Sequence, residues 1–121
     1  MGKEASWTEK NNEGIDSYVK EVFRSTFREL LGPAGLSALE HYLNRRLQHD
    51  MYEVLVSSPP IFYNALKNFL GKGADAILRI LAMKLIEEGK MIGVSPEEFL
   101  ELMKSDDEES YKRFLRVFKW G

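Results

Sequence analysis

Apolar side chains recur along the chain at a spacing of three or four residues, beginning at Ile15. This spacing places apolar residues on one face of an α-helix and charged residues on the other. A first helix is expected over residues 15–31, because Gly32 can adopt the positive φ of a helix C-terminus and Pro33 blocks continuation. Its apolar stripe consists of Ile15, Tyr18, Val19, Val22, Phe23, Phe27, Leu30 and Leu31.

Two further helices and one ambiguous segment follow. A second helix is expected over residues 36–48, joined to the first by a short link as an αα-hairpin. Residues 51–56 fit either a helical turn or a short extended piece, and their helical surroundings favour the turn. A third helix begins at Pro59, with Ser58 as the residue that caps its free amides, and ends at Gly71.

The last part of the chain predicts three more helices. The fourth, over residues 73–88, is apolar on nearly all sides, which is typical of a helix in the middle of a bundle. A fifth helix follows Ser95, since Glu98 three residues later completes a capping box. The same spacing at Ser105 and Glu108 predicts the start of a sixth helix. The apolar stripe of this sixth helix is formed by Tyr111, Phe114, Leu115 and Phe118.

No segment shows the strict alternation of apolar and polar residues that is typical of a strand. The pattern therefore predicts an all-α fold, a single compact domain of about six helices with bundle-like or orthogonal packing. Residues 1–14 are mostly polar and are expected to form a flexible N-terminal tail, ahead of a helical domain over residues 15–121.

Composition narrows the classes of function. The 121 residues contain no cysteine, which excludes disulfide scaffolds, thiolate zinc sites and cysteine nucleophiles. The 17 Lys and Arg residues against 19 Asp and Glu give a net charge of -2, which makes nucleic acid an unlikely partner. No apolar run has the length of a membrane span, and the first dozen residues lack the apolar segment of a signal peptide. We therefore expect a cytoplasmic protein with no membrane contact.

No constellation of residues predicts catalysis, a metal or a cofactor. Lys72 lies before a helix, but the spacing and the hydroxyl of a phosphate-binding loop are missing. Gly71 is expected to end a helix and Gly73 to allow close helix approach, so that leucine at Gly73 is expected to destabilise the fold. The only histidines, His41 and His49, are eight residues apart and cannot form a one-turn zinc pair. The chain is thus expected not to be an enzyme.

The end of the chain carries one basic and aromatic patch that fits an interaction surface. It consists of Lys112, Arg113, Arg116, Val117, Lys119 and Trp120. Such a patch is typical of contact with nucleic acid, an anionic membrane or an acidic partner, although cations also stabilise a helix C-terminus. Val117 and Trp120 lie off the stripe of the sixth helix, and Met91 and Ile92 add apolar surface, which favours a homodimer. The alternative is that Val117 and Trp120 pack over the first helix.

The segment PPIFYNALKNFLGKGA, starting at Pro59, carries a family resemblance. Its pattern PxxFxxALxxxxGxGA is formed by Pro59, Phe62, Ala65, Leu66, Gly71, Gly73 and Ala74. With the flanking apolar residues it resembles the small archaeal domain known as the Nitrosopumilus output domain, over about residues 20–88. The resemblance divides the domain into a family-like core, residues 15–89, and a C-terminal helical hairpin, residues 90–121. It implies a helical signalling output module in an archaeal protein and no catalytic residues.

The sequence therefore predicts a non-enzymatic helical interaction module in an archaeal regulatory system, with an unidentified protein partner. Two alternatives stay open. One is a nucleic-acid-associated regulator that uses residues 112–119, and the other is a small-ligand sensor with a pocket between the third and fourth helices.

Overall fold

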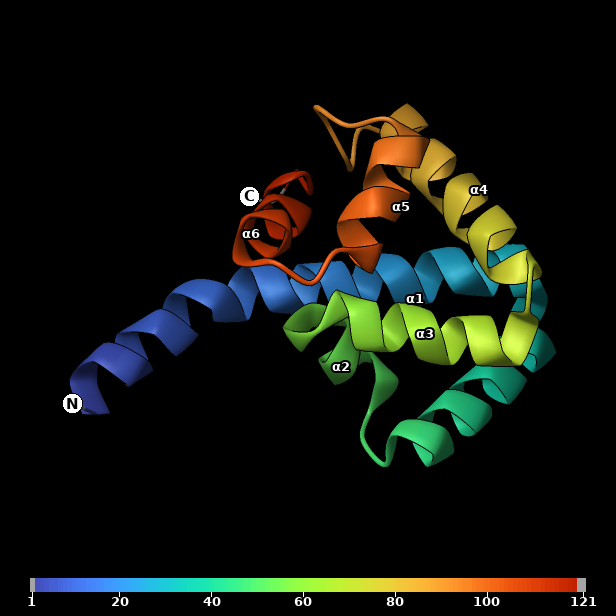
Figure 1. Ribbon diagram of the computed structural model, residues 1–121, viewed down its shortest axis with the longest axis horizontal. Helices are drawn as coiled ribbons and strands as arrows, with labels where there is room; N and C mark the ends of the chain where they lie inside the picture. Colours follow the sequence, from blue (N-terminus) through green and yellow to red (C-terminus); the bar gives the residue numbers. More distant parts are fainter. Residues whose placement is uncertain (1, 120–121) are drawn as a thin grey trace.

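A computed structural model describes the backbone of residues 2–119 and the side chains of residues 14–119 (Figure 1). Within this range the chain forms six helices and no strand, which confirms the predicted all-α single domain. A flexible tail is predicted over residues 1–14. The side chains of residues 1–13 lie outside the described residues, so the tail stays a prediction. The helices are α1 (Gly2–Leu47), α2 (Met51–Ser57), α3 (Pro59–Leu70), α4 (Gly73–Glu87), α5 (Pro96–Lys104) and α6 (Glu108–Arg116).

Helix α1 consists of two segments that meet at a sharp break. Gly32 has φ 80° and ψ 167°, a conformation open to glycine because it has no Cβ, and Pro33 follows it. The second segment turns back and contacts α2 and α3, below the first segment in Figure 1. The predicted helix end at Gly32 and the predicted hairpin are both confirmed.

The junction between α2 and α3 corrects one predicted cap. Residues 51–57 are helical, as their surroundings predict. Ser58 occupies the position before α3, but its side chain makes no capping hydrogen bond, so the predicted cap is wrong. Pro59 and Pro60 have no amide N–H to satisfy, and the amide of Ile61 donates to the backbone carbonyl of Ser58 (3.0 Å). The first turn of α3 therefore has few free amide N–H groups that the Ser58 hydroxyl could cap.

Of the two predicted capping boxes, one is present. Ser95 Oγ accepts from the amide of Glu98 (3.1 Å), and the Glu98 side chain accepts from the amide of Ser95 (2.9 Å). The second box is wrong, because Ser105 ends α5 and its hydroxyl donates to the carbonyl of Glu101 (2.8 Å). Asp107 caps α6 instead, accepting from the amide of Ser110 (2.7 Å).

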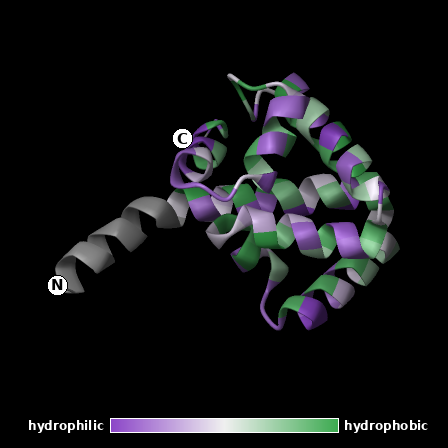
Figure 2. Cartoon of the chain, viewed as in Figure 1, coloured by the Kyte–Doolittle hydropathy of each residue, from purple (hydrophilic) through white to green (hydrophobic). Residues whose placement is uncertain are grey.

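Helix α4 is not in the middle of the bundle, contrary to its apolar sequence. It contacts α1, α3 and α5 on one side only, and it forms an edge of the molecule in Figure 1. Ile80 and Met83, on the other side, are 50% and 51% exposed. Figure 2 shows hydrophobic and hydrophilic residues interspersed along this helix.

The core is centred on aromatic rings from distant parts of the chain. Phe23 on α1 lies with its ring centroid 5.8–6.3 Å from the rings of Phe27, Phe62, Phe99 and Phe118. The prediction that Phe118 lies on the sixth helix is wrong, because α6 ends at Arg116. It lies instead in the short segment that pairs with Met91 as an isolated antiparallel bridge. The hairpin over residues 90–121 thus contributes directly to the core.

Alanine at Gly71 is expected to lower the free energy of unfolding by about 1–3 kcal/mol, because Gly71 ends α3 at φ 59° and ψ −133°, where a Cβ is strained. Gly73 is the matched control, since a Cβ there would meet only Leu70 Cβ at 3.9 Å. The close helix approach predicted at Gly73 is therefore wrong, and Gly73→Ala should be neutral or slightly stabilising. Urea unfolding of both variants checks this, and equal losses would contradict it.

Candidate functional site

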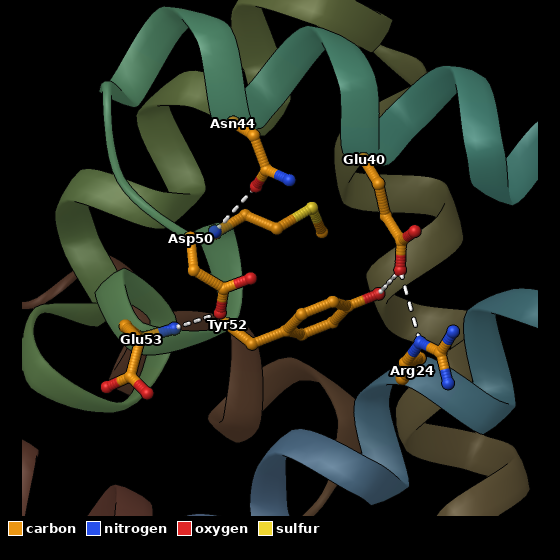
Figure 3. A network of polar contacts seen from close by, with 7 residues as sticks. Arg24, Glu40, Asn44, Asp50, Tyr52 and Glu53 are labelled. Carbon is orange, nitrogen blue, oxygen red and sulfur yellow. Dashed lines mark hydrogen bonds and ion pairs between the residues drawn. The ribbon is translucent and has the colours of Figure 1, made fainter.

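A polar bridge fixes the second segment of α1 against the first segment and against α2 (Figure 3). Glu40 Oε2 accepts from the hydroxyl of Tyr52 (2.8 Å) and from Nε of Arg24 (3.3 Å). Burial of Tyr52, together with its bond to Glu40, raises the pKa of this phenol well above its ordinary value. The tyrosine therefore stays protonated and acts as a hydrogen-bond donor, which makes this bridge structural.

The turn between α1 and α2 is held by two further side chains. Asn44 Oδ1 accepts from the amide of Met51 (2.7 Å), and Asp50 caps α2 by accepting from the amide of Glu53 (3.1 Å). Lys20 forms an ion pair with Glu53. Together these contacts fix the second segment of α1 relative to α2, and Figure 3 shows those of Asn44, Asp50 and Glu53.

Two adjoining hollows that share Arg46 lie along this second segment of α1. The first, of about 430 Å³, is lined by side chains of α1 alone, and the second, of about 310 Å³, lies between α1 and α3. We call the two hollows together the α1–α3 groove. It is lined by His41, Tyr42, Arg45, Arg46, Leu47, Ile61, Asn64, Ala65 and Asn68.

The α1–α3 groove combines free positive charge with an exposed apolar side chain. Arg45 and Arg46 are exposed, and neither has an ion-pair partner among the side chains of residues 14–119. Ile61 is 53% exposed and lines the second hollow together with Arg46, while Arg45 lines the first. Asn64 and Asn68 supply amide groups on the same wall. A guanidinium presents a planar fork of donors that fits a carboxylate, so the arrangement can hold an acidic group next to an apolar one.

Aromatic and small residues stabilise the walls of the groove. Tyr42 of α1 stacks on Phe69 of α3 with ring centroids 4.5 Å apart, which holds the two helices together. Ala65 is buried and lines the second hollow. Ala65 is also the one motif residue that reaches the groove. Of the other motif residues, Pro59, Phe62, Leu66 and Ala74 are buried, while Gly71 and Gly73 lie at helix ends.

The surface predicted at the end of the chain is partly used inside the molecule. Val117 is buried. The chain leaves α6 at this residue, and the backbone carbonyl of Val117 accepts from the amide of Ile92 (2.9 Å). Nζ of Lys112 lies 3.7 Å from Oε2 of Glu108, and the guanidinium of Arg113 donates to the backbone carbonyl of Gly93 (3.1 Å).

All four basic residues of this predicted surface are exposed: Lys112, Arg113, Arg116 and Lys119. Arg116 and Lys119 have no ion-pair partner among the described side chains. Trp120 lies outside the described residues. Met91 is buried while Ile92 is exposed, so the apolar patch that favoured a homodimer at this end is largely interior.

A second polar cluster ties α3 to α4 and α5. The hydroxyl of Tyr63 donates to Asp75 Oδ1 (2.5 Å), and Lys104 Nζ lies 3.6 Å from Asp75 Oδ2. Burial and the bond to Asp75 raise the pKa of Tyr63 to about 12, and the same bond lowers the pKa of Asp75. Tyr63, Asp75 and Lys104 satisfy one another's hydrogen bonds and charges, which fits a structural role in joining the three helices.

The described side chains contain no group of three or more His, Asp or Glu residues arranged to hold a metal ion. His41 and His49 are both exposed, and only His41 lines the α1–α3 groove. Lys72, between Gly71 and Gly73, is exposed at the start of α4.

Sequence reasoning did not single out Arg45, Arg46 or Ile61. A pair of arginines in the last turn of a helix is an ordinary partner of the helix dipole, and Ile61 is one residue off the apolar stripe of its helix. Only the return of α1 past α3 brings these residues together. The sequence signal that could have found them is the absence of an acidic residue three or four positions before either arginine.

Among the described residues, no helix is both long enough and apolar enough to cross a lipid bilayer. No family model matches the chain, and neither the search of curated proteins nor that of solved structures finds a match. The resemblance to the Nitrosopumilus output domain therefore stays a prediction carried by the motif that begins at Pro59.

Proposed function

We propose that the protein is a non-enzymatic helical interaction module that binds a protein partner in the α1–α3 groove. The observation that carries the proposal is the pair Arg45 and Arg46, which have no ion-pair partner among the described side chains. Arg46 joins the two hollows and lines the second one together with the exposed Ile61. Arginine and large apolar side chains that are buried on binding contribute much of the energy of protein interfaces.

The chemistry of the α1–α3 groove specifies the partner. A segment that carries Asp or Glu next to an apolar side chain would place its carboxylates on Arg45 and Arg46 and its apolar group against Ile61. Asn64 and Asn68 would complete the polar rim by bonding to the partner's backbone. An acidic amphipathic helix presents these groups together, and we propose it as the occupant.

The wider setting follows from the resemblance of the motif at Pro59. In that setting the module is a cytoplasmic output domain of an archaeal signalling system, without catalytic residues or a cofactor. The polar clusters support a role without catalysis, because Tyr52 and Tyr63 are protonated donors to structural carboxylates. A conformational or chemical signal would reach the partner through occupancy of the groove.

Charge reversal of the groove tests the proposal. The double variant Arg45→Glu/Arg46→Glu is compared with Arg116→Glu/Lys119→Glu, which changes the same number of exposed cations on the other predicted surface. In affinity capture from nuclease-treated extract of the source organism, the wild type and the second variant should retain the same protein. The groove variant should retain roughly tenfold less of this protein, or even less.

Three results would contradict the proposal. One is undiminished capture by the groove variant, and another is loss of the partner only with the Arg116 and Lys119 changes. The third is capture that is seen in a parallel untreated extract and disappears on nuclease treatment, which would favour the alternative of a nucleic-acid-associated regulator. Circular dichroism of both variants verifies that each is folded.

A further inference from the structure

Helix α4 presents a continuous stripe that no other described part of the molecule covers. The stripe consists of Lys72, Ala76, Ile80, Met83 and Glu87, all of which are exposed. At 100° per residue these five positions fall within an arc of about 80° along one side of the helix. Three apolar side chains therefore form its centre, and one charged side chain stands at each end. We call this surface the α4 stripe.

The two charges at the ends of the α4 stripe differ from the other charges of the helix. Asp75 pairs with Tyr63 and Lys104, Arg79 with Glu97, and Lys84 with Glu29 and Glu88. Among the described side chains, Lys72 and Glu87 have no ion-pair partner. Opposite charges thus stand unpaired at the two ends of an apolar stripe.

The α4 stripe is complementary to a second α4 stripe that runs in the opposite direction. When two copies of α4 run antiparallel about an axis between Arg79 and Ile80, Lys72 of each copy lies opposite Glu87 of the other. Ala76 then lies opposite Met83, a small side chain against a long flexible one, and the two Ile80 side chains meet near the axis. A stripe in parallel register would place like charges opposite each other.

We propose that the α4 stripe is the interface of a symmetric antiparallel dimer with a second copy of this chain. The contact goes beyond the proposed function, because no residue of the α1–α3 groove lies on α4, so both copies keep a free groove. It also replaces the homodimer surface predicted at Val117, which is buried. One pair of helices about 22 Å long makes a small interface, so the dimer is expected to be weak, with a Kd in the micromolar range.

Sedimentation equilibrium from about 1 µM to about 1 mM tests the dimer, and charge exchange tests its register. The wild type should pass from monomer to dimer over this range, whereas Ile80→Glu should remain a monomer. Lys72→Glu or Glu87→Lys alone should weaken association about three- to tenfold, because each places like charges at both ends of the interface. The double variant Lys72→Glu/Glu87→Lys restores both pairs and should associate within about twofold of the wild type.

The charge variants should remain folded, because Lys72 and Glu87 are exposed and have no ion-pair partner among the described side chains. A loss of association in these variants therefore reports on the interface and not on unfolding. A wild type that remains monomeric at every concentration would overturn the proposal. A dimer that survives Ile80→Glu, or a double variant as weak as the single ones, would overturn it equally, since either result places the contact elsewhere.

Discussion

Replacement of Phe23 by alanine is expected to lower the free energy of unfolding by about 3–5 kcal/mol. Phe23 is fully buried, and its ring meets rings from α1, α3, α5 and the segment after α6. Removal of the ring takes away its transfer free energy and leaves a cavity where four elements converge. Four neighbours held by three helices and by the segment after α6 cannot all move inward to fill that cavity, so the loss should lie at the large end for core substitutions.

Urea unfolding of the purified variant measures this loss, with Ile92→Ala as the control. Ile92 is 55% exposed, so its truncation should change the free energy of unfolding by less than about 0.5 kcal/mol. A Phe23→Ala variant as stable as the Ile92→Ala variant would show that the aromatic cluster is not the centre of the core.

A chain that ends after Gly89 is expected not to fold cooperatively. The removed hairpin contributes eight buried apolar side chains: Met91, Phe99, Leu100, Leu102, Met103, Phe114, Val117 and Phe118. At roughly 1.5–3 kcal/mol each, their burial contributes about 10 kcal/mol or more, comparable with the whole stability of a domain of this size. The shortened chain would also lose the rings of Phe99 and Phe118 that lie against Phe23.

Thermal denaturation followed by circular dichroism checks the expected loss of cooperativity. Removal of residues 1–13, most of the predicted tail, is the control and should leave the transition in place. A sharp transition in the shortened chain would show that the hairpin is an independent addition to a self-sufficient core, as the extent of the family resemblance suggests.

Local signals predicted the helices well because each depends on a few neighbouring residues. Gly32 followed by Pro33 predicts the break in α1, and the capping box of Ser95 and Glu98 predicts the start of α5. The errors arise where two local options compete. Ser105 could cap a new helix or end the old one, and Asp107, two residues later, is the acceptor that caps the amides of α6.

Tertiary position was harder to predict than helix position. The composition of α4 predicts burial on all sides, but its place at the edge of the molecule leaves Ile80 and Met83 exposed. Val117 lies off the apolar stripe of α6, yet the chain leaves the helix at that residue and turns back to Ile92. Hydrophobic periodicity shows which side of a helix is apolar, but not how many neighbours cover it.

The candidate groove could be predicted least of all. Arg45 and Arg46 are separated by about fifteen residues from Ile61. The break at Gly32, the bridge of Glu40 and Tyr52 and the stack of Tyr42 on Phe69 bring α1 and α3 side by side. A groove between helices depends on such distant contacts, which no spacing along the chain reports.

The most direct test of the proposed function is a map of amide chemical shifts in the full chain, recorded as the captured partner is added. Binding in the α1–α3 groove predicts the largest shifts over residues 41–47 and 61–68, weakened by Arg45→Glu/Arg46→Glu and by increased salt. Amides of residues 112–119 should move little. Largest shifts over residues 112–119, or shifts unchanged by reversal of the two arginines, would contradict it.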